Sequence, residues 1–323
     1  MQKATWTQIR SELKQSYSPV PSLAILAVDL LMLAASWHFS YQGTVAGWLL
    51  GQFLLVIALI HVYVIHHEAV HHAVFERRVH NEILGHLLSL LIAMPFLPRR
   101  HSHLHHHSWS GNVNDPSHRR IIEKLSKSTA GQLRLMDLMW ALYLPFLALN
   151  ERLAFWRMPF QQWKAGDRTG DVRQERAYAL GYLAVYGLLG ILLAGLGVLG
   201  AFAAWFLPAT FILLFVEEMI NLPHHIDIPM IDTPKPLPLW EQDQTTHSCQ
   251  SVPLWSSLIL LNFNMHTAHH LFPWIPWHKL PQAQQHMQRY APELGEENTD
   301  EFSWLRKRRT FAITDKFIAH LKK

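Results

Sequence analysis

The segment NFNMHTAHHLFP, residues 262–273, carries three histidines whose spacing suits metal binding. His266, His269 and His270 stand at positions i, i+3 and i+4, so a helix would present their imidazoles on one face about a turn apart. Imidazole nitrogen binds iron, zinc, copper and nickel, whereas magnesium and calcium prefer oxygen ligands. The segment is therefore predicted to offer nitrogen donors to a transition metal.

Two earlier segments repeat this chemistry. His103, His106 and His107 have the same spacing, and His67 and His71 stand four residues apart in HHEAVHH. The three clusters together offer eight imidazoles, more than one tetrahedral ion can use. We therefore predict two metal ions that share these histidines, with coordination left open for water, oxygen or substrate.

Neighbouring histidines compete with this assignment. His66, His72, His101 and His105 adjoin the chosen residues, and the last two form an i, i+4 pair of their own. We prefer the triplet that begins at His103 because it repeats the spacing of the final cluster. A hydrogen-bonded or surface role is the ordinary expectation for the others, namely His38, His61, His80, His86, His118, His247, His278, His286 and His320.

The composition indicates a lipid environment for these clusters. Half of the 323 residues are hydrophobic and only 16% are charged, against roughly 25% in a soluble protein. The single cysteine, Cys249, excludes an internal disulfide, a four-cysteine zinc site and an iron-sulfur cluster built on the chain's own thiols. Any metal is therefore expected to bind to histidine, carboxylate or amide groups.

Four apolar stretches are each near the ~20 residues that cross a hydrocarbon layer of about 30 Å. They are residues 20–39, 45–65, 177–196 and 201–220, and short links join them in pairs. We predict an all-α membrane protein with four transmembrane helices in two hairpins and a cytoplasmic helical cap that carries the histidine clusters. The predicted domains are an interfacial segment at 1–19, a membrane domain at 20–281 and a C-terminal cap at 282–323.

Lysine and arginine predict the orientation, since cytoplasmic loops retain positive charge. Three of the 28 precede the first span, 15 lie between Arg77 and Arg176, and ten follow from Lys235 onward, while neither hairpin link has any. Both termini and every histidine cluster are thus expected on the cytoplasmic side. The run Arg306 to Arg309 is either a solvated basic face or a contact for anionic headgroups.

Shorter features complete the expected organisation. Residues 83–97, 133–149 and 252–263 are apolar but too short to span, so we predict interfacial or re-entrant segments. Residues 1–17 have the pattern of a weakly amphipathic interfacial helix. Asp29 lies alone inside the first span, where a charge is costly, and we expect it to pair with a polar group across the hairpin or to line a cavity.

The chain resembles the membrane fatty acid desaturase and hydroxylase superfamily of non-haem diiron oxygenases. The resemblance rests on HEAVH at 67–71, HLHHHSWS at 103–110 and HTAHHLFPWIPWHKLP at 266–281, in that order, with the second apolar hairpin between the last two. It covers nearly all of residues 20–281, and the third motif is the most specific.

Further site residues follow from this resemblance. Asn221 and His225 in NLPHH match the family's asparagine and the histidine four residues after it, which implies His225 as a ninth ligand and Asn221 as the holder of a metal-bound water. His224 is the competing choice. The chain has Ala268 where many relatives carry Glu, and Ser110 where many carry Thr. Neither residue is a ligand, so these departures bear on subfamily and substrate.

The resemblance also implies a reaction. Two ferrous ions activate dioxygen, and hydrogen is removed from an unactivated carbon in an apolar channel. Desaturation of a fatty acyl or lipid chain is our first expectation, and hydroxylation or ketone formation on an alkyl or terpenoid chain is the alternative. Carboxylates that could orient the ligands are Glu68, Asp115, Glu217, Glu218, Asp227 and Asp243.

The oxidation requires external electrons, so a separate donor is implied, such as a ferredoxin, rubredoxin or cytochrome b5 type protein with its reductase. Arg77, Arg78, Arg99 and Arg100 could dock an acidic donor, although the orientation rule would place basic residues there in any case. The expected partners are this donor, a lipid substrate and the membrane, and no nucleic acid.

Two other functional classes fit parts of the sequence. His67, Glu68 and His71 satisfy the H-E-x-x-H pattern of a zinc protease, with Glu68 as general base, but this interpretation leaves the later clusters unexplained. A metal transporter would place histidines and carboxylates along a path through the spans. The clusters instead gather at one membrane face.

Overall fold

The computed structural model describes residues 1–13, 17–228, 230–294 and 299–318. Within these ranges the regular structure is helical, and one isolated bridge joins Asn112 and Ile231. The chain divides into two compact units. We call residues 17–103 with 147–216 the hairpin unit, and residues 1–16, 104–146 and 217–323 the cap unit.

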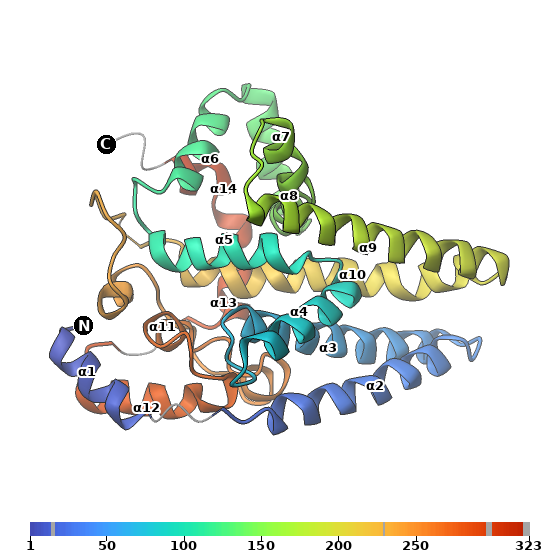
Figure 1. Ribbon diagram of the computed structural model, residues 1–323, viewed down its shortest axis with the longest axis horizontal. Coiled ribbons are helices and arrows are strands. Elements are labelled where there is room, and N and C mark those ends of the chain that lie inside the picture. The colour runs from blue at the N-terminus through green and yellow to red at the C-terminus, as the bar shows by residue number, and fades with distance from the viewer. Residues whose placement is uncertain (14–16, 229, 295–298, 319–323) are drawn as a thin grey trace. The chain divides into compact units, whose positions relative to one another are not determined.

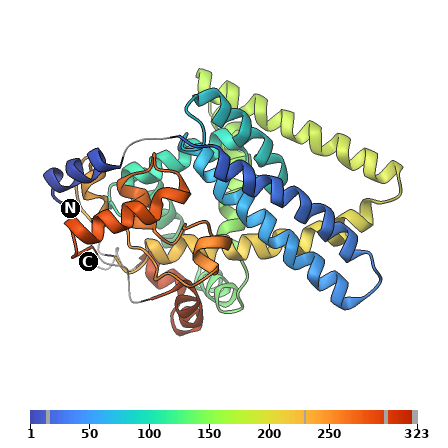
Figure 2. The ribbon, with the colours of Figure 1, turned by 90° about the horizontal axis from the view of Figure 1, so that it is seen from below.

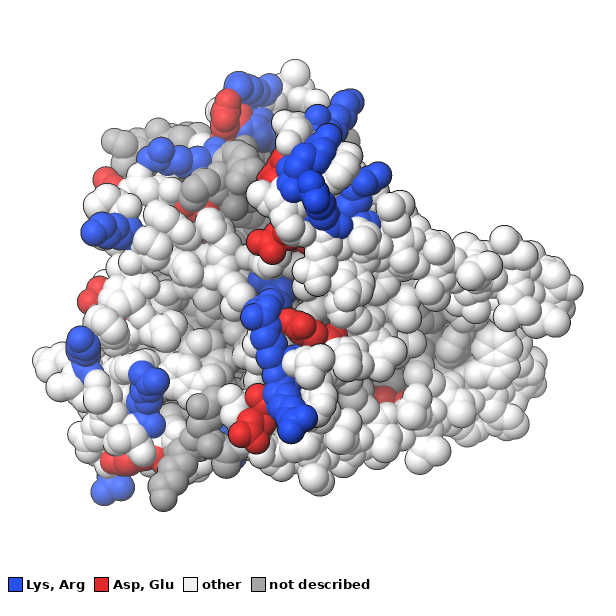
Figure 3. Space-filling view, viewed as in Figure 1, with Lys and Arg blue, Asp and Glu red and all other residues white. Residues whose placement is uncertain are grey.

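Four helices are long and apolar enough to cross a membrane, as predicted: α2 (Val20–Ser40), α3 (Val45–Val70), α9 (Gly170–Gly195) and α10 (Leu199–Asn221). Figures 1 and 2 show α2 and α3 side by side. Outward-facing apolar residues such as Leu31 and Ile191 are each 72% exposed, which suits lipid rather than water. The far ends of the hairpins show no charged residue on the face seen in Figure 3.

Local chemistry explains the two hairpins. The Thr44 side chain caps α3 by accepting a hydrogen bond from the Gly47 amide, and Gly43 supplies a left-handed turn with φ 73°. Trp205 of α10 ties the hairpins together. Its indole donates to the Ser36 hydroxyl at 2.7 Å, and its carbonyl accepts from the Gln52 amide at 3.0 Å.

The helix α3 is longer than predicted. It continues to Val70, so His67 lies inside the helix rather than in a loop beyond the second span, and His71 follows as its C-cap. The sequence between Ile65 and Val70 contains neither glycine nor proline, so nothing in it ends the helix at the membrane boundary.

Proline divides two of the predicted short segments. The chain forms α4 (Arg78–Ile92) and α5 (Phe96–Trp109), and its direction changes by 105° at the break between these two helices. Pro95 cannot donate an amide hydrogen and disfavours helix at the residue before it, and Ala93 is left-handed with φ 51°. Pro145 likewise separates α7 (Ala130–Ala141) from α8 (Phe146–Lys164). A short π-helix at Trp255–Ile259 occupies the third segment.

The cap unit is built around α11 (His266–Leu271). The helices α1 (Lys3–Glu12) and α12 (Leu280–Tyr290) lie side by side in Figures 1 and 2, and they pack with α11 in one apolar core. The Trp6 indole donates to the Leu271 carbonyl at 2.9 Å. Trp6 and Ile9 on the apolar face of α1 are therefore buried in protein, and the interfacial position of residues 1–19 stays a prediction.

The C-terminal basic run is also partly buried. Arg308 has no exposed surface, stacks over Trp140 and pairs with Glu218 at 2.9 Å. Burial lowers the pKa of the Arg308 guanidinium, while Glu218 opposes that shift. Arg308 is thus unavailable to lipid headgroups. It anchors the segment before α14 (Ile313–Ile318) to the end of α10.

Asp29 does find a partner across the first hairpin. Its carboxylate lies 2.8 Å from His61 Nδ1, and both side chains are buried. We predict that Asp29→Leu, which removes this carboxylate from a buried imidazole, lowers the free energy of unfolding by roughly 2–4 kcal/mol. Thermal unfolding of the detergent-purified protein measures the change. The double variant Asp29→Leu/His61→Leu should recover much of the loss, and an equally unstable double variant would contradict this.

Candidate metal centre

One group of four histidines lies wholly within the cap unit. It comprises His106 on α5, His225 just beyond α10, and His266 and His270 on α11. Their Nε2 atoms approach one another, at 3.1 Å for His106 and His225, 2.9 Å for His225 and His266, and 3.1 Å for His266 and His270. All four candidate ligand atoms lie within 4.8 Å of each other. We call these residues the four-histidine group.

Hydrogen bonds on the opposite ring nitrogens orient this group. His225 Nδ1 faces the Thr245 carbonyl at 3.2 Å and the Ser110 hydroxyl at 3.1 Å. His270 Nδ1 faces Gln242 Oε1 at 3.2 Å. A carbonyl or amide oxygen can only accept, so Nδ1 carries the proton and the Nε2 lone pair points into the group.

Burial keeps three of these imidazoles neutral. It lowers the pKa of His225 to about 4 and holds the pKa of His266 and of His270 well below the usual range, with neighbouring histidines adding to the shift in the latter two. The inward-facing lone pairs of His225 and His270 repel each other, and a cation between them would relieve this repulsion. The donor set therefore fits a borderline transition metal such as Fe²⁺, and not Mg²⁺ or Ca²⁺.

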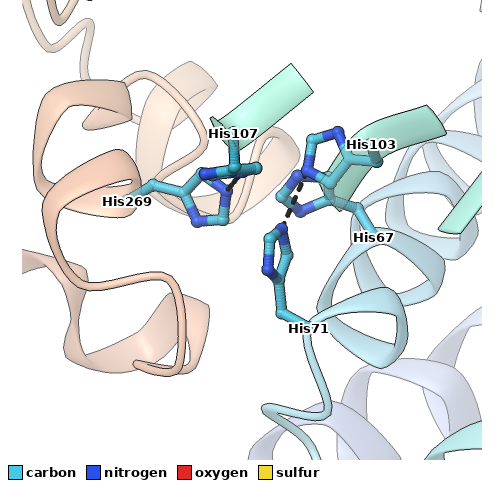
Figure 4. A group of neighbouring side chains, drawn as sticks. All are labelled: His67, His71, His103, His107 and His269. Carbon is cyan, nitrogen blue, oxygen red and sulfur yellow. Dashed lines mark hydrogen bonds between the residues drawn. The ribbon is translucent and has the colours of Figure 1, made fainter. Parts of the chain in front are cut away.

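The remaining predicted ligands form two smaller sets, both drawn in Figure 4. In the hairpin unit, His103 and His71 have Nε2 atoms 2.8 Å apart, and the His67 ring centroid lies 4.5 Å from that of His103. We call these three the histidine triad. In the cap unit, His107 and His269 have Nε2 atoms 3.1 Å apart and form the histidine pair. Burial lowers the pKa of His269 to about 3, so it too is neutral.

The triplets do not present one face each, and that part of our expectation was wrong. On α11, His266 and His270 join the four-histidine group, whereas His269 contacts His107. On α5, it is His106 that joins this group. The side chains of consecutive residues in a helix point in directions about 100° apart, so adjacent histidines face different neighbours.

The competing histidines have other partners. His66 lies 3.1 Å from the Ser89 hydroxyl, His101 2.5 Å from Glu175, and His105 2.8 Å from Asp115. His72 has left-handed backbone geometry with φ 55°, just beyond α3. His224 stacks on His266 with ring centroids 4.4 Å apart, but His225 rather than His224 belongs to the four-histidine group.

The remaining predicted site residues occupy defined positions. Asn221 ends α10, and its amide nitrogen donates to the Glu217 carbonyl at 2.7 Å. Glu68 is buried on α3 beside His67. Several proposed orienting carboxylates have partners elsewhere: Asp115 with His105, Glu218 with Arg308, Asp227 with Lys316, and Asp243 with the N-terminal amine.

Gln242 and the Thr245 carbonyl instead contact the predicted ligands His270 and His225, and sequence reasoning did not find them. Gln242 precedes His270 by 28 residues, and no motif spacing connects the two. Its own amide nitrogen donates to the Leu237 carbonyl at 3.3 Å, which fixes the oxygen toward His270. No pattern in the sequence marked this glutamine as a site residue.

A cavity of about 200 Å³ borders the four-histidine group within the cap unit. His106 and His225 line it together with Trp109, Leu222 and Ile226. Drug-sized ligand pockets are usually about 300–1,000 Å³. This cavity is smaller, and its lining also includes Asp115, Asp227 and Lys316, so it suits a small molecule.

Comparison with known proteins agrees with this arrangement. The family model "Fatty acid desaturase" matches residues 43–298. A fatty acid desaturase of Bacillus subtilis (strain 168) is 33% identical over 81 residues, which cover 24% of this chain and 23% of that relative. An sn-1 oleoyl-lipid 12-desaturase of Anabaena variabilis is 24% identical over 258 residues, which cover 76% of this chain and 70% of the relative. The chain thus spans under a quarter of the first relative's length and over two thirds of the second's.

The orienting role of Gln242 can be tested directly. We predict that Gln242→Leu weakens Fe²⁺ binding by about 10–100-fold, because His270 loses the acceptor that fixes its tautomer. Competition with a chromogenic chelator measures the affinity in the purified, anaerobic protein. Gln244→Leu is the matched control, because Gln244 is exposed and lies two residues further along the chain. Equal iron affinity in the two leucine variants would rule out the orienting role.

Proposed function

This chain belongs to the fatty acid desaturase family, and from that premise we propose that it is an O2-dependent diiron desaturase of acyl chains in membrane lipids. The observation that carries the proposal is the convergence of four imidazoles in the four-histidine group, where burial keeps His225, His266 and His270 neutral. The four apolar helices support a lipid substrate, because an enzyme embedded in the bilayer meets acyl chains directly.

We propose that one iron binds the four-histidine group and that the residues of the histidine triad and of the histidine pair are also iron ligands, as the resemblance to the family implies. Two ferrous ions would supply the dioxygen activation that removes hydrogen from an unactivated carbon. The chain's own residues keep the ligands neutral, oriented and shielded from water.

Asn221 is proposed to position a water at the site. The hydrogen bond from the Asn221 side-chain nitrogen to the Glu217 carbonyl fixes the plane of the side-chain amide. Asn221 is the last residue of α10 and precedes His225 by four residues. Glu68, buried next to His67, is proposed to support the triad rather than to act as a protease base. The HEAVH segment lies within the residues that match the desaturase family, which favours this role.

The electron balance requires a donor. Removing two hydrogens from the acyl chain and reducing O2 to two waters takes two further electrons and two protons. We propose a separate ferredoxin, rubredoxin or cytochrome b5 type donor with its reductase. Arg77 and Arg78 are exposed and could dock its acidic surface. Arg99 is only 7% exposed and lies 3.6 Å from Glu151, so it is a poor docking residue.

We further propose that both termini and the histidines face the cytoplasm. The distribution of lysine and arginine supports this orientation, since the two hairpin links contain none of the 28.

The proposal predicts a specific lipid change. Cells that express the chain should gain unsaturated acyl chains, and His266→Ala should abolish the gain because it removes a central ligand of the four-histidine group. Mass spectrometry of total lipids measures the difference. His80→Ala, at an exposed histidine outside both ligand sets, is the matched control and should behave as the parent.

Other outcomes would redirect the assignment. Hydroxylated or ketone products lost in His266→Ala would indicate the alternative oxidation of an alkyl or terpenoid chain. Identical lipid profiles in the parent and His266→Ala would contradict the proposed function.

A further inference from the structure

Three buried side chains with metal-binding atoms meet in the cap unit outside the predicted iron ligands. They are His224 in the 3-10 turn after α10, Cys249 in the extended segment before the π-helix, and Glu301 at the start of α13 (Glu301–Lys307). One nitrogen, one sulfur and one oxygen from these residues lie within 4.8 Å of one another. Their exposed fractions are 0%, 2% and 0%.

His224 is held with one nitrogen turned toward this cluster. Its Nδ1 donates to the His247 carbonyl at 2.9 Å, so the neutral ring has its lone pair on Nε2. Nε2 is buried and has no hydrogen-bond partner among the described residues. This is the arrangement by which proteins orient a metal-ligating histidine.

Glu301 contributes a fully buried carboxyl group to this cluster. Neither of its oxygens has a hydrogen-bond partner within the part of the chain that the structure describes. Burial raises the pKa of Glu301 to about 7. A buried carboxylate without compensation is costly, whereas a bound cation would compensate it.

The backbone fixes the three segments that carry these side chains. The Cys249 amide donates to the Asn264 carbonyl at 3.0 Å, and the Asn264 side chain donates back to the Cys249 carbonyl at 3.2 Å. The Gln250 amide donates to the Thr299 carbonyl at 3.2 Å. Asp300 caps α13 by accepting from the Ser303 amide. The cluster is therefore assembled before any ion arrives.

We propose that His224, Cys249 and Glu301 form a separate site for one divalent ion of the zinc class. A thiolate, an imidazole and a carboxylate are a usual zinc donor set, with water as the fourth ligand, and the thiolate excludes Mg²⁺ and Ca²⁺. Tetrahedral zinc requires ligand atoms roughly 3.5 Å apart, so a small closure of these side chains completes the site.

The proposed ion has a structural consequence for the iron ligands. It joins the turn after α10 to the start of α13. His224 precedes His225 directly, and its ring stacks on His266 with centroids 4.4 Å apart. The zinc site therefore positions two members of the four-histidine group without touching the substrate. The proposal does not depend on iron occupancy or on the reaction catalysed.

The single cysteine of the chain makes this site spectroscopically distinct. We would titrate the full-length, detergent-purified and chelator-treated protein with Co²⁺ and record the thiolate-to-cobalt absorption in the near ultraviolet. Histidine-bound Co²⁺ elsewhere lacks this band, so any such band originates at Cys249. We expect the band to reach the intensity of one thiolate-bound Co²⁺ per chain and to disappear when Zn²⁺ is added.

Variants then test the other two ligands. Glu301→Gln and His224→Ala should each weaken the Co²⁺ binding seen in the band by at least about tenfold, and Cys249→Ser should abolish the band. Glu123→Gln, at an exposed glutamate of the same unit, is the control and should match the parent. Absence of the band in the folded parent, which needs no variant, would overturn the proposal. Unchanged Co²⁺ affinity in Glu301→Gln and His224→Ala, measured from this band, would overturn it as well.

Discussion

The hydrogen bonds on the Nδ1 atoms of His225 and His270 are the constraint on which the metal chemistry depends. They decide that each Nε2 faces inward as a lone pair, and burial removes protonation as a way to relieve the resulting repulsion. Without these bonds either ring could reverse its tautomer and donate a hydrogen bond to its neighbour. The acceptors thus convert a cluster of histidines into a ligand set.

The rest of the cap unit serves to hold these acceptors and ligands in place. The core formed by α1, α11 and α12 immobilises α11, the helix that carries His266 and His270. The Trp6 indole also donates a hydrogen bond to the carbonyl of Leu271, the last residue of α11. Arg308 fixes the end of α10, which leads into His225. Segments far from the histidine motifs in the sequence are therefore needed for the geometry of the motifs.

The four spans and the histidine motifs could be predicted because each depends on local signals. Twenty apolar residues indicate a span, and i, i+4 spacing indicates neighbours on a helix. The division of each triplet could not be predicted, because spacing does not reveal what stands opposite a helical face. Gln242 and Arg308 gave no local signal either. Their roles arise from loops and tails that meet the histidines only in the folded chain.

The central claim is that the histidines of this chain hold two irons that act together. Mössbauer spectroscopy of the ⁵⁷Fe-loaded, purified protein, combined with an iron count per chain, tests it most directly. The account predicts close to two irons per chain and, after oxidation, a magnetically coupled pair. One iron per chain, or two irons without coupling, would contradict it.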